Sequence, residues 1–273
     1  MKKITLSLLL LASFNVFGAD ASYDLISENY QKSKEKDNRR DIDDFNVFFY
    51  IDNLKNKSVL DLACGEGHYA RKFKDAGAKK VHGVDLSSKM IDLAKKIEEK
   101  EPKGIEYSVA NVAHDLDLGQ FDIVSGIFLL HYASDKKELC QFTKQIFQSL
   151  KPGGSFLGLN ANPESINFEE NYYKPFGMSA VYQQPVQDGS IIQIKLYNKD
   201  SSTVSFNVHN YYLQTYLSCL KEARLENIEF LPLLISPNAI AKNGWNYWLP
   251  YIQKTPLFVI KAKKPASHSK TEL

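Results

Sequence analysis

Two closely spaced glycines, Gly65 and Gly67, separate the apolar run Ser58–Leu62 from the amphipathic segment His68–Ala76. The run is short and rich in aliphatic side chains, which is typical of a buried strand. The segment after the glycines carries apolar residues at helical spacing and stops at Gly77, which predicts a helix. A strand, a glycine loop and a helix in this order predict an open α/β sheet with a ligand bound where the strand ends.

The alternation of strands and helices continues to Asn160, and Ser87 and Ser134 mark the starts of two further helices. Five strands alternating with helices predict a mainly parallel, doubly wound sheet. Beyond Asn160 we expect an antiparallel hairpin, a helix over residues 211–226 and two strands that complete a seven-stranded sheet. The predicted strands are Ser58–Leu62, Val81–Leu86, Ile105–Ala110, Phe121–Phe128, Ser155–Asn160, Ile191–Tyr197, Thr203–His209, Ile228–Leu233 and Leu257–Lys261.

The first residues have the pattern of a secretory signal peptide. Lys2 and Lys3 precede the apolar stretch Ile4–Phe17, and Ala19-Asp20-Ala21 offers a cleavage site. We therefore expect export to the periplasm or the medium; the alternative is a buried helix in a cytoplasmic protein. The expected domains are a signal peptide (1–21), an N-terminal helical cap (22–57), a catalytic-type α/β domain (58–265) with a substrate-side insertion (161–210), and a frayed tail (266–273).

The composition excludes some partners. The 273 residues carry a net charge of +2 without a clustered basic face, so we expect no nucleic-acid partner. No segment after the leader approaches the length of apolar chain that spans a bilayer, so we expect no stable membrane insertion. Cys64, Cys140 and Cys219 are odd in number and far apart, and we expect all three as reduced thiols. We assign no metal ligands.

Asp61 decides which ligand the glycine loop suits. Gly65 to Ala70 matches the dinucleotide pattern G-x-G-x-x-A, which alone is a weak signal. A carboxylate at the end of the first strand would repel a pyrophosphate and attract a cation, by about 4 kcal/mol across ~4 Å at an effective dielectric of ~20. The negative charge of Asp61 favours a cationic ligand, such as one with an ammonium group, over a dinucleotide, unless Asp61 only caps a turn.

Asp85 ends the next strand, where a carboxylate accepts hydrogen bonds from both ribose hydroxyls of a nucleotide. In that arrangement Leu86 and Met90 flank the adenine. The alternative is a favourable charge at the start of the next helix, worth only ~0.3–1 kcal/mol.

The ordered motifs resemble the class I S-adenosylmethionine-dependent methyltransferases. They are Asp61-x-x-Cys64-Gly65-x-Gly67, Gly83-Val84-Asp85, Phe121-Asp122-Ile123-Val124 and Leu150-Lys151-Pro152-Gly153-Gly154, and with the segment at Tyr30 they look most like the toxoflavin-synthase-like branch, which methylates small heterocycles. The resemblance implies a Rossmann-like fold. It also implies a cofactor site made of Tyr30, Asp61, Ala63, Cys64, Gly65, Gly67, Asp85, Leu86, Met90, Asn111, Val112 and Phe128. Asn111 departs from the family, which usually has an acidic residue there, so we expect weaker adenine binding.

The expected reaction is methyl transfer from S-adenosyl-L-methionine to a small-molecule acceptor, with an N-heterocycle as one candidate. Alignment of the acceptor can supply ~7–11 kcal/mol, and a general base is optional. His131, beside Tyr132, is the best candidate base, although it can equally be a polar residue that ends a strand. Asn160 and Asn162 are candidate orienting donors. The alternatives are an NAD-dependent oxidoreductase and a non-catalytic S-adenosylmethionine-binding module.

We expect an aromatic acceptor pocket built by the N-terminal helix and the insertion, because stacking and cation–π attraction suit a flat ring and a sulfonium. For any single side chain, a place in the core is the stronger alternative. The candidate side chains are Tyr172, Tyr173, Phe176, Tyr182, Tyr211, Tyr212, Trp245, Tyr247 and Trp248.

Overall fold

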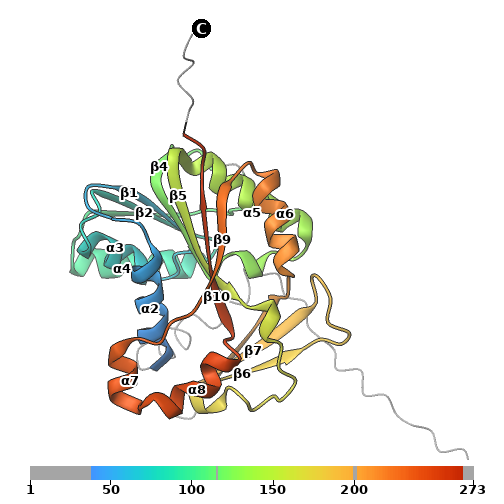
Figure 1. Cartoon of the computed structure of the whole chain (residues 1–273). Helices are drawn as coiled ribbons and strands as arrows, with labels where there is room; N and C mark the ends of the chain where they lie inside the picture. Colours follow the sequence, from blue (N-terminus) through green and yellow to red (C-terminus); the bar gives the residue numbers. More distant parts are fainter. Residues whose placement is uncertain (1–37, 115, 199–201, 267–273) are drawn as a thin grey trace, which may run out of the picture.

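The computed structural model describes residues 38–114, 116–198 and 202–266. Seven strands form the main sheet: β1 (Ser58–Leu62), β2 (Lys80–Asp85), β3 (Ile105–Val109), β4 (Phe121–Ile127), β5 (Leu150–Ala161), β9 (Glu226–Pro232) and β10 (Leu257–Lys263). Their order is β3-β2-β1-β4-β5-β10-β9. β10 runs antiparallel to β5 and β9, and the pairs from β3 to β5 are parallel. The structure confirms the predicted mainly parallel seven-stranded sheet (Figure 1).

Helices cover both faces of this sheet (Figure 1). They are α2 (Asn38–Tyr50), α3 (His68–Asp75), α4 (Ser88–Lys100), α5 (Lys136–Ser149), α6 (Leu213–Glu222), α7 (Pro237–Asn243) and α8 (Trp245–Gln253). Apolar side chains of α2, α3 and α4 pack in one core with alternate strand residues such as Val59 and Val81. Those of α5 and α6 pack in a second core with the intervening residues, such as Leu60 and Val124. The alternation of strand side chains between two faces is what makes the sheet doubly wound.

The starts of α3, α4, α5 and α6 agree with the sequence to within two residues. The Ser87 hydroxyl accepts a hydrogen bond from the Met90 amide at 3.2 Å, so Ser87 caps α4 as expected. The next helix was expected to begin at Ser134, but Asp135 caps it and α5 begins at Lys136. Ser134 instead donates from its amide and its hydroxyl to the Glu138 carboxylate, both at 2.7 Å.

A second, antiparallel sheet lies between β5 and α6 in the sequence, in the predicted insertion. It contains β6 (Met178–Tyr182), β7 (Ile191–Tyr197) and β8 (Thr203–His209) in that order. The β7–β8 hairpin confirms the expected pairing, with Ile194 opposite Phe206. Strand β6 and helices α7 and α8 were not predicted. β6 has only five residues and follows glycine, so local periodicity gives little signal there.

Cys140 on α5 and Cys219 on α6 form a disulfide across 79 residues of sequence. The expectation of three reduced thiols is therefore wrong for these two, while Cys64 is free and buried. Wide spacing in the sequence does not keep these cysteines apart, because α5 and α6 pack side by side and bring the two Cα atoms to 4.6 Å. A separation in that range allows a disulfide.

Among the described residues, no helix has the length and apolarity needed to cross a membrane. The expected signal peptide, the helix over residues 23–36 and Tyr30 lie outside the described residues, as does most of the expected tail.

Candidate functional site

The glycine loop lies at the carboxyl end of the main sheet, between β1 and α3. Gly65 and Gly67 have φ values of +56° and +85°, which a side chain would disfavour. Ala63 and Phe128, which follow the adjacent strands β1 and β4, have positive φ values of +56° and +61° although they are not glycine. Such backbone strain clusters at functional sites, and here it marks the edge where ligands bind in open α/β sheets.

Asp85 holds this loop against the end of β2 by hydrogen bonds. One oxygen of its carboxylate accepts the Gly65 amide at 2.8 Å, and the other accepts the Ser87 amide at 2.9 Å. A Cβ on Gly83 would come within 2.9 Å of the Cys64 sulfur, so glycine at this position lets the loop approach the sheet. A Cβ on Gly65 would meet nothing within 4 Å, so open space lies over the loop. A carboxylate oxygen can accept more than one hydrogen bond, which suits Asp85 to a ligand hydroxyl.

The loop is electronegative. Asp61 is 1% exposed and accepts a hydrogen bond from the Ser125 hydroxyl of β4 at 2.7 Å. Burial and the nearby carboxylates of Asp85, Asp61 and Glu66 raise the pKa of the Cys64 thiol well above its ordinary value. Glu66 is paired with Arg71 and Arg40, so Asp61 and Asp85 are the carboxylates that suit a ligand with positive charge and hydroxyl donors and that disfavour the pyrophosphate of a dinucleotide.

The residues expected around the adenine follow the ends of β2 and β3 or, in the case of Met90, lie on α4. Leu86 is half-buried, and Met90 and Val112 are buried. The Asn111 side-chain oxygen accepts a hydrogen bond from the Ala113 amide at 2.8 Å within its own turn. One lone pair of that oxygen is therefore used locally, which sharpens the expectation of a weak adenine contact. These side chains and the electronegative loop fit S-adenosylmethionine.

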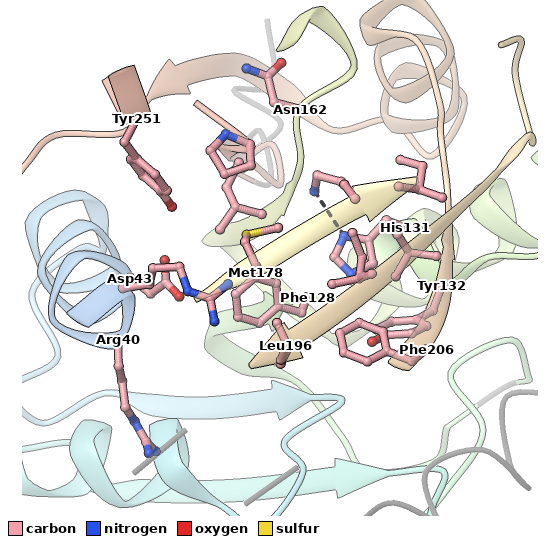
Figure 2. Close-up of a pocket in the computed structure, with 18 of the residues that line it drawn as sticks. Arg40, Asp43, Phe128, His131, Tyr132, Asn162, Met178, Leu196, Phe206 and Tyr251 are labelled. Carbon is pink, nitrogen blue, oxygen red and sulfur yellow. Dashed lines mark hydrogen bonds between the residues drawn. The ribbon is translucent and has the colours of Figure 1, made fainter. Parts of the chain in front are cut away.

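A cavity adjoins this loop through His68 and Phe128. The predicted catalytic residues His131 and Tyr132 both line it, opposite α2 (Figure 2). The small sheet forms another wall. The lining residues are Arg39, Arg40, Asp43, His68, Tyr69, Phe128, His131, Tyr132, Ala161, Asn162, Met178, Ala180, Tyr182, Ile192, Ile194, Leu196, Phe206, Val208, Tyr251, Pro256 and Leu257.

His131 is poorly arranged for a base. Its side chain is buried, and its Nδ1 accepts the Ala161 amide at 3.0 Å (Figure 2, dashed line). Burial, and to a lesser degree His209, lowers the pKa of His131 to about 3, so the ring is neutral at physiological pH. With Nδ1 accepting, the proton of the neutral ring is on Nε2. Burial also raises the pKa of Tyr132 far above its ordinary value, which keeps the phenol protonated.

The nine candidate aromatic residues do not form the expected pocket, since only Tyr182 among them lines the cavity. Tyr211 is buried and donates to the Ala133 carbonyl at 2.7 Å, Trp248 is buried and donates to the Ala239 carbonyl at 2.9 Å, and Trp245 is 49% exposed. The polar groups of Tyr211 and Trp248 donate hydrogen bonds to backbone carbonyls in the core. Composition alone cannot reveal such partners. The cavity's other aromatic side chains are those of Tyr69, Phe128, Tyr132, Phe206 and Tyr251.

The two asparagines predicted as orienting donors have structural partners. The buried Asn160 accepts the Leu130 amide at 2.9 Å and does not line the cavity. Asn162 lines it, but its amide donates to Ser165 and to the Thr255 carbonyl. His68 begins α3, as expected, and contacts the Asp44 carboxylate of α2 at 2.9 Å.

Charged residues of α2 were missed as cavity residues. Arg39, Arg40 and Asp43 all line the cavity, and Figure 2 shows Asp43 and Arg40 extending from this helix. The sequence placed a helix here and a cap over the substrate, so the helical spacing of these three residues was a usable signal. Which face of the helix turns inward depended on its docking. Asn46 fixes that docking by exchanging hydrogen bonds with the Leu234 backbone, each at 2.8 Å.

Comparisons with known proteins agree with this geometry. Residues 59–154 match the family model of a methyltransferase domain. The chain is 28% identical over 185 residues to the mRNA cap guanine-N(7) methyltransferase of Saccharomyces cerevisiae, covering 62% of this chain and 41% of that protein. It is 32% identical over 130 residues to the ubiquinone biosynthesis O-methyltransferase of Coxiella burnetii, covering 47% and 53%.

Among solved structures, the CcbJ methyltransferase of Streptomyces caelestis has the same fold, with a TM-score of 0.61, 19% identity and coverage of 90% of this chain and 98% of that one. The chain spans about half or less of the length of the curated relatives it matches. Residues 59–154 therefore match a methyltransferase domain, and the chain has the fold of solved S-adenosylmethionine-dependent methyltransferases.

Proposed function

We propose that this chain transfers the methyl group of S-adenosylmethionine to a small-molecule acceptor held in the cavity. The observation that carries the proposal is the position of the cavity, which adjoins the glycine loop through His68 and the strained residue Phe128. S-adenosylmethionine, when bound, supplies an already activated methyl group. The chain's own residues then need to bind, align and dehydrate the two reactants, which can account for ~7–11 kcal/mol of the barrier.

Each group of residues has a distinct task in this proposal. Asp85 accepts the ribose hydroxyls while it holds the glycine loop, and Asp61 contributes negative charge for the cationic ligand. Apolar side chains around the cavity exclude water from the reacting atoms. A flat N-heterocycle, the narrower candidate, would contact the rings of Phe128, Tyr132 and Phe206.

The named relatives act on different acceptors, an mRNA cap and an intermediate of ubiquinone biosynthesis. We favour a small molecule because apolar residues dominate the walls of the cavity. A capped RNA needs cationic side chains for its phosphates, and Arg39 and Arg40 are the cavity's only lysine or arginine side chains within the described part of the chain.

The proposal is tested with methyl-labelled S-adenosylmethionine and extract of the native host, separated afterwards into RNA, protein and low-molecular-mass fractions. We expect label in the low-molecular-mass fraction. Label confined to RNA would overturn the small-molecule acceptor. Tight binding of S-adenosylhomocysteine without any transfer would favour the non-catalytic module, and binding of NAD in its place would favour the oxidoreductase.

We also propose that the protein is exported. The leader over residues 1–21 motivates this, and the Cys140–Cys219 disulfide supports it, because disulfides persist mainly in oxidising compartments. N-terminal sequencing of the protein from its native host is the test, and we expect the mature chain to begin near Ala19 or Ser22. An intact Met1 or Lys2 on protein from the cytoplasm would overturn export.

A further inference from the structure

We infer that the methyl acceptor is a lipophilic molecule, whose apolar body lies on the small sheet and whose reactive end presents a hydrogen-bond-accepting atom to the Nε2–H of His131. The inference rests on the proposed function and narrows it to an acceptor class. It is carried by two independent features of the cavity, an aliphatic wall and the oriented His131 donor.

The aliphatic wall is one face of the small sheet. In β6 and β7, Met178 pairs with Leu196 and Ala180 pairs with Ile194, while in β7 and β8 Ile194 pairs with Phe206. All five side chains line the cavity. Because side chains alternate along a strand, these paired residues share one face. Five residues of β6 extend over about 13 Å at ~3.3 Å per residue, so the wall is longer than a single aromatic ring.

The opposite face of the same sheet is different. Gln193, Ser205 and Asn207 alternate with the cavity residues and are exposed. The sheet is therefore amphipathic, as expected for strands with one solvated face. Its apolar face lines the cavity, where Ile194 and Phe206 are the partly exposed members, so a molecule bound against this face meets apolar side chains.

The oriented donor lies at the end of the cavity near the main sheet. His131 Nδ1 is occupied by the Ala161 amide, so Nε2 carries the proton and can only donate. The 3₁₀ turn Leu130–Tyr132 that carries the ring is itself held, since the Leu130 amide donates to the Asn160 side chain at 2.9 Å. The Ala161 amide thus holds the ring, and the Asn160 side chain holds the turn that carries it. A carbonyl, phenolic or ring-nitrogen acceptor atom complements this donor, whereas an ammonium group would not.

The first experiment uses a homologous series of probes, methyl, butyl and octyl 4-hydroxybenzoate, titrated into full-length protein saturated with S-adenosylhomocysteine. Each methylene that enters an apolar site can tighten binding by up to about 4-fold, and we expect octyl to bind at least ~10-fold more tightly than butyl. Ile194→Gln, on the aliphatic wall, should reduce this gain. Gln193→Ala, one residue along and on the exposed face, is the matched control and should retain it.

The second experiment addresses His131 with the octyl probe. His131→Ala removes the donor and should weaken binding about 2- to 12-fold, the range of one net hydrogen bond. His131→Gln retains an N–H near the Nε2 position and should restore most of the affinity. Unchanged affinity in His131→Ala would overturn the donor role, and so would equal losses in both variants.

S-adenosylhomocysteine affinity is measured in every variant, because it separates two failures. If the wild type binds S-adenosylhomocysteine but shows no dependence on chain length, the lipophilic acceptor is wrong and the methyltransferase proposal stands. If S-adenosylhomocysteine does not bind to the wild type, the proposed function itself fails. A variant that loses S-adenosylhomocysteine binding has misfolded, and Phe206→Gln then replaces Ile194→Gln on the same wall.

Discussion

The cofactor loop and the acceptor cavity are neighbours, but they are built in opposite ways. The loop is polar and is held by short hydrogen bonds between a side chain and the backbone, such as those from Gly65 and Ser87 to Asp85. The cavity is mainly apolar, and its walls come from α2, the turn after β4, the small sheet and α8. Residues within about 30 positions form the loop, whereas those around the cavity extend from Arg39 to Leu257.

This contrast explains which reactant each region can recognise. Hydrogen bonds need donors and acceptors at set distances and directions, so a polar site is selective for one arrangement of ligand groups. Apolar contact is not directional and depends on the area that is buried. We therefore expect substitutions in the loop to abolish cofactor binding, and substitutions in the cavity to change acceptor affinity by degrees.

The largest effect is expected for Asp85→Ala. The variant loses two charge-assisted bonds to the ribose, each worth ~1.5–3 kcal/mol, and water partly replaces them, so we expect a loss of about 2–4 kcal/mol, or ~30- to 1000-fold in S-adenosylhomocysteine affinity. Calorimetry with S-adenosylhomocysteine measures this. Asp92→Ala, an exposed acidic residue on α4, is the control. Affinity like that of wild type in Asp85→Ala would show that the ribose lies elsewhere.

Removal of the Cys140–Cys219 disulfide separates the stability of the fold from both sites. The bond lies between α5 and α6 and is typical of cross-links worth about 2–4 kcal/mol. Reductant, or the double variant Cys140→Ala/Cys219→Ala, should lower the free energy of unfolding in urea by that amount while S-adenosylhomocysteine affinity stays unchanged. Reductant added to the double variant should have no further effect. A wild-type unfolding midpoint that is the same with and without reductant would contradict the prediction.

Phe206→Ala tests the acceptor side of the comparison. Its half-buried ring lines the cavity and lies 6.5 Å from the Tyr132 ring. Truncation should weaken binding of octyl 4-hydroxybenzoate by about 1–3 kcal/mol, or ~5- to 150-fold, because apolar contact is lost. The substitution should leave the cofactor loop unchanged, so S-adenosylhomocysteine affinity is the internal control. Thr203→Ala, at an exposed position on the same strand, is the matched control variant. Parallel losses of both ligands would show that the two regions are not independent.

The smallest effect is expected at the amino end of the sheet, remote from both regions. Burial raises the pKa of Asp122, but hydrogen bonds from Ser58 and Lys151 outweigh it and hold that pKa well below its ordinary value. A depressed carboxyl pKa stabilises the fold above the unfolded pKa of ~3.9 and loses this contribution as pH falls below it. Because the pair is partly exposed, Asp122→Asn should cost only about 1 kcal/mol at pH 7.

Urea unfolding of wild type and Asp122→Asn from pH 7 to pH 3 checks this sign. The difference between the two proteins should shrink as pH falls below about 4. A difference that is constant, or that grows in acid, would contradict the assigned charge state of Asp122.

The strand and helix pattern was predictable to within a few residues wherever hydrophobic periodicity was strong. β1, β4 and α4 follow their predicted ranges closely, and the β7–β8 hairpin was found from its two β-rich runs. β6, α7 and α8 were missed because short segments next to glycine and proline carry little periodic signal. The disulfide was missed because the packing of α5 against α6 is not a property of either segment alone.

The sequence by itself determined the nucleotide half of the site. A glycine loop with Asp61 and Asp85 at successive strand ends is local in the chain, and the parallel order of strands brings such ends together in any sheet of this class. The charge sign of these carboxylates needed no coordinates.

Only the tertiary structure decided the acceptor half. Whether an aromatic side chain lines a cavity or fills a core depends on which face of each element turns inward, and that is set by packing between segments far apart in the sequence. Tyr211 and Phe206 illustrate this, since the first is buried against the Ala133 carbonyl and the second lines the cavity. The neutral, Nε2-protonated state of His131 likewise follows from burial and from the Ala161 amide, a neighbour 30 residues away that folding brings to the ring.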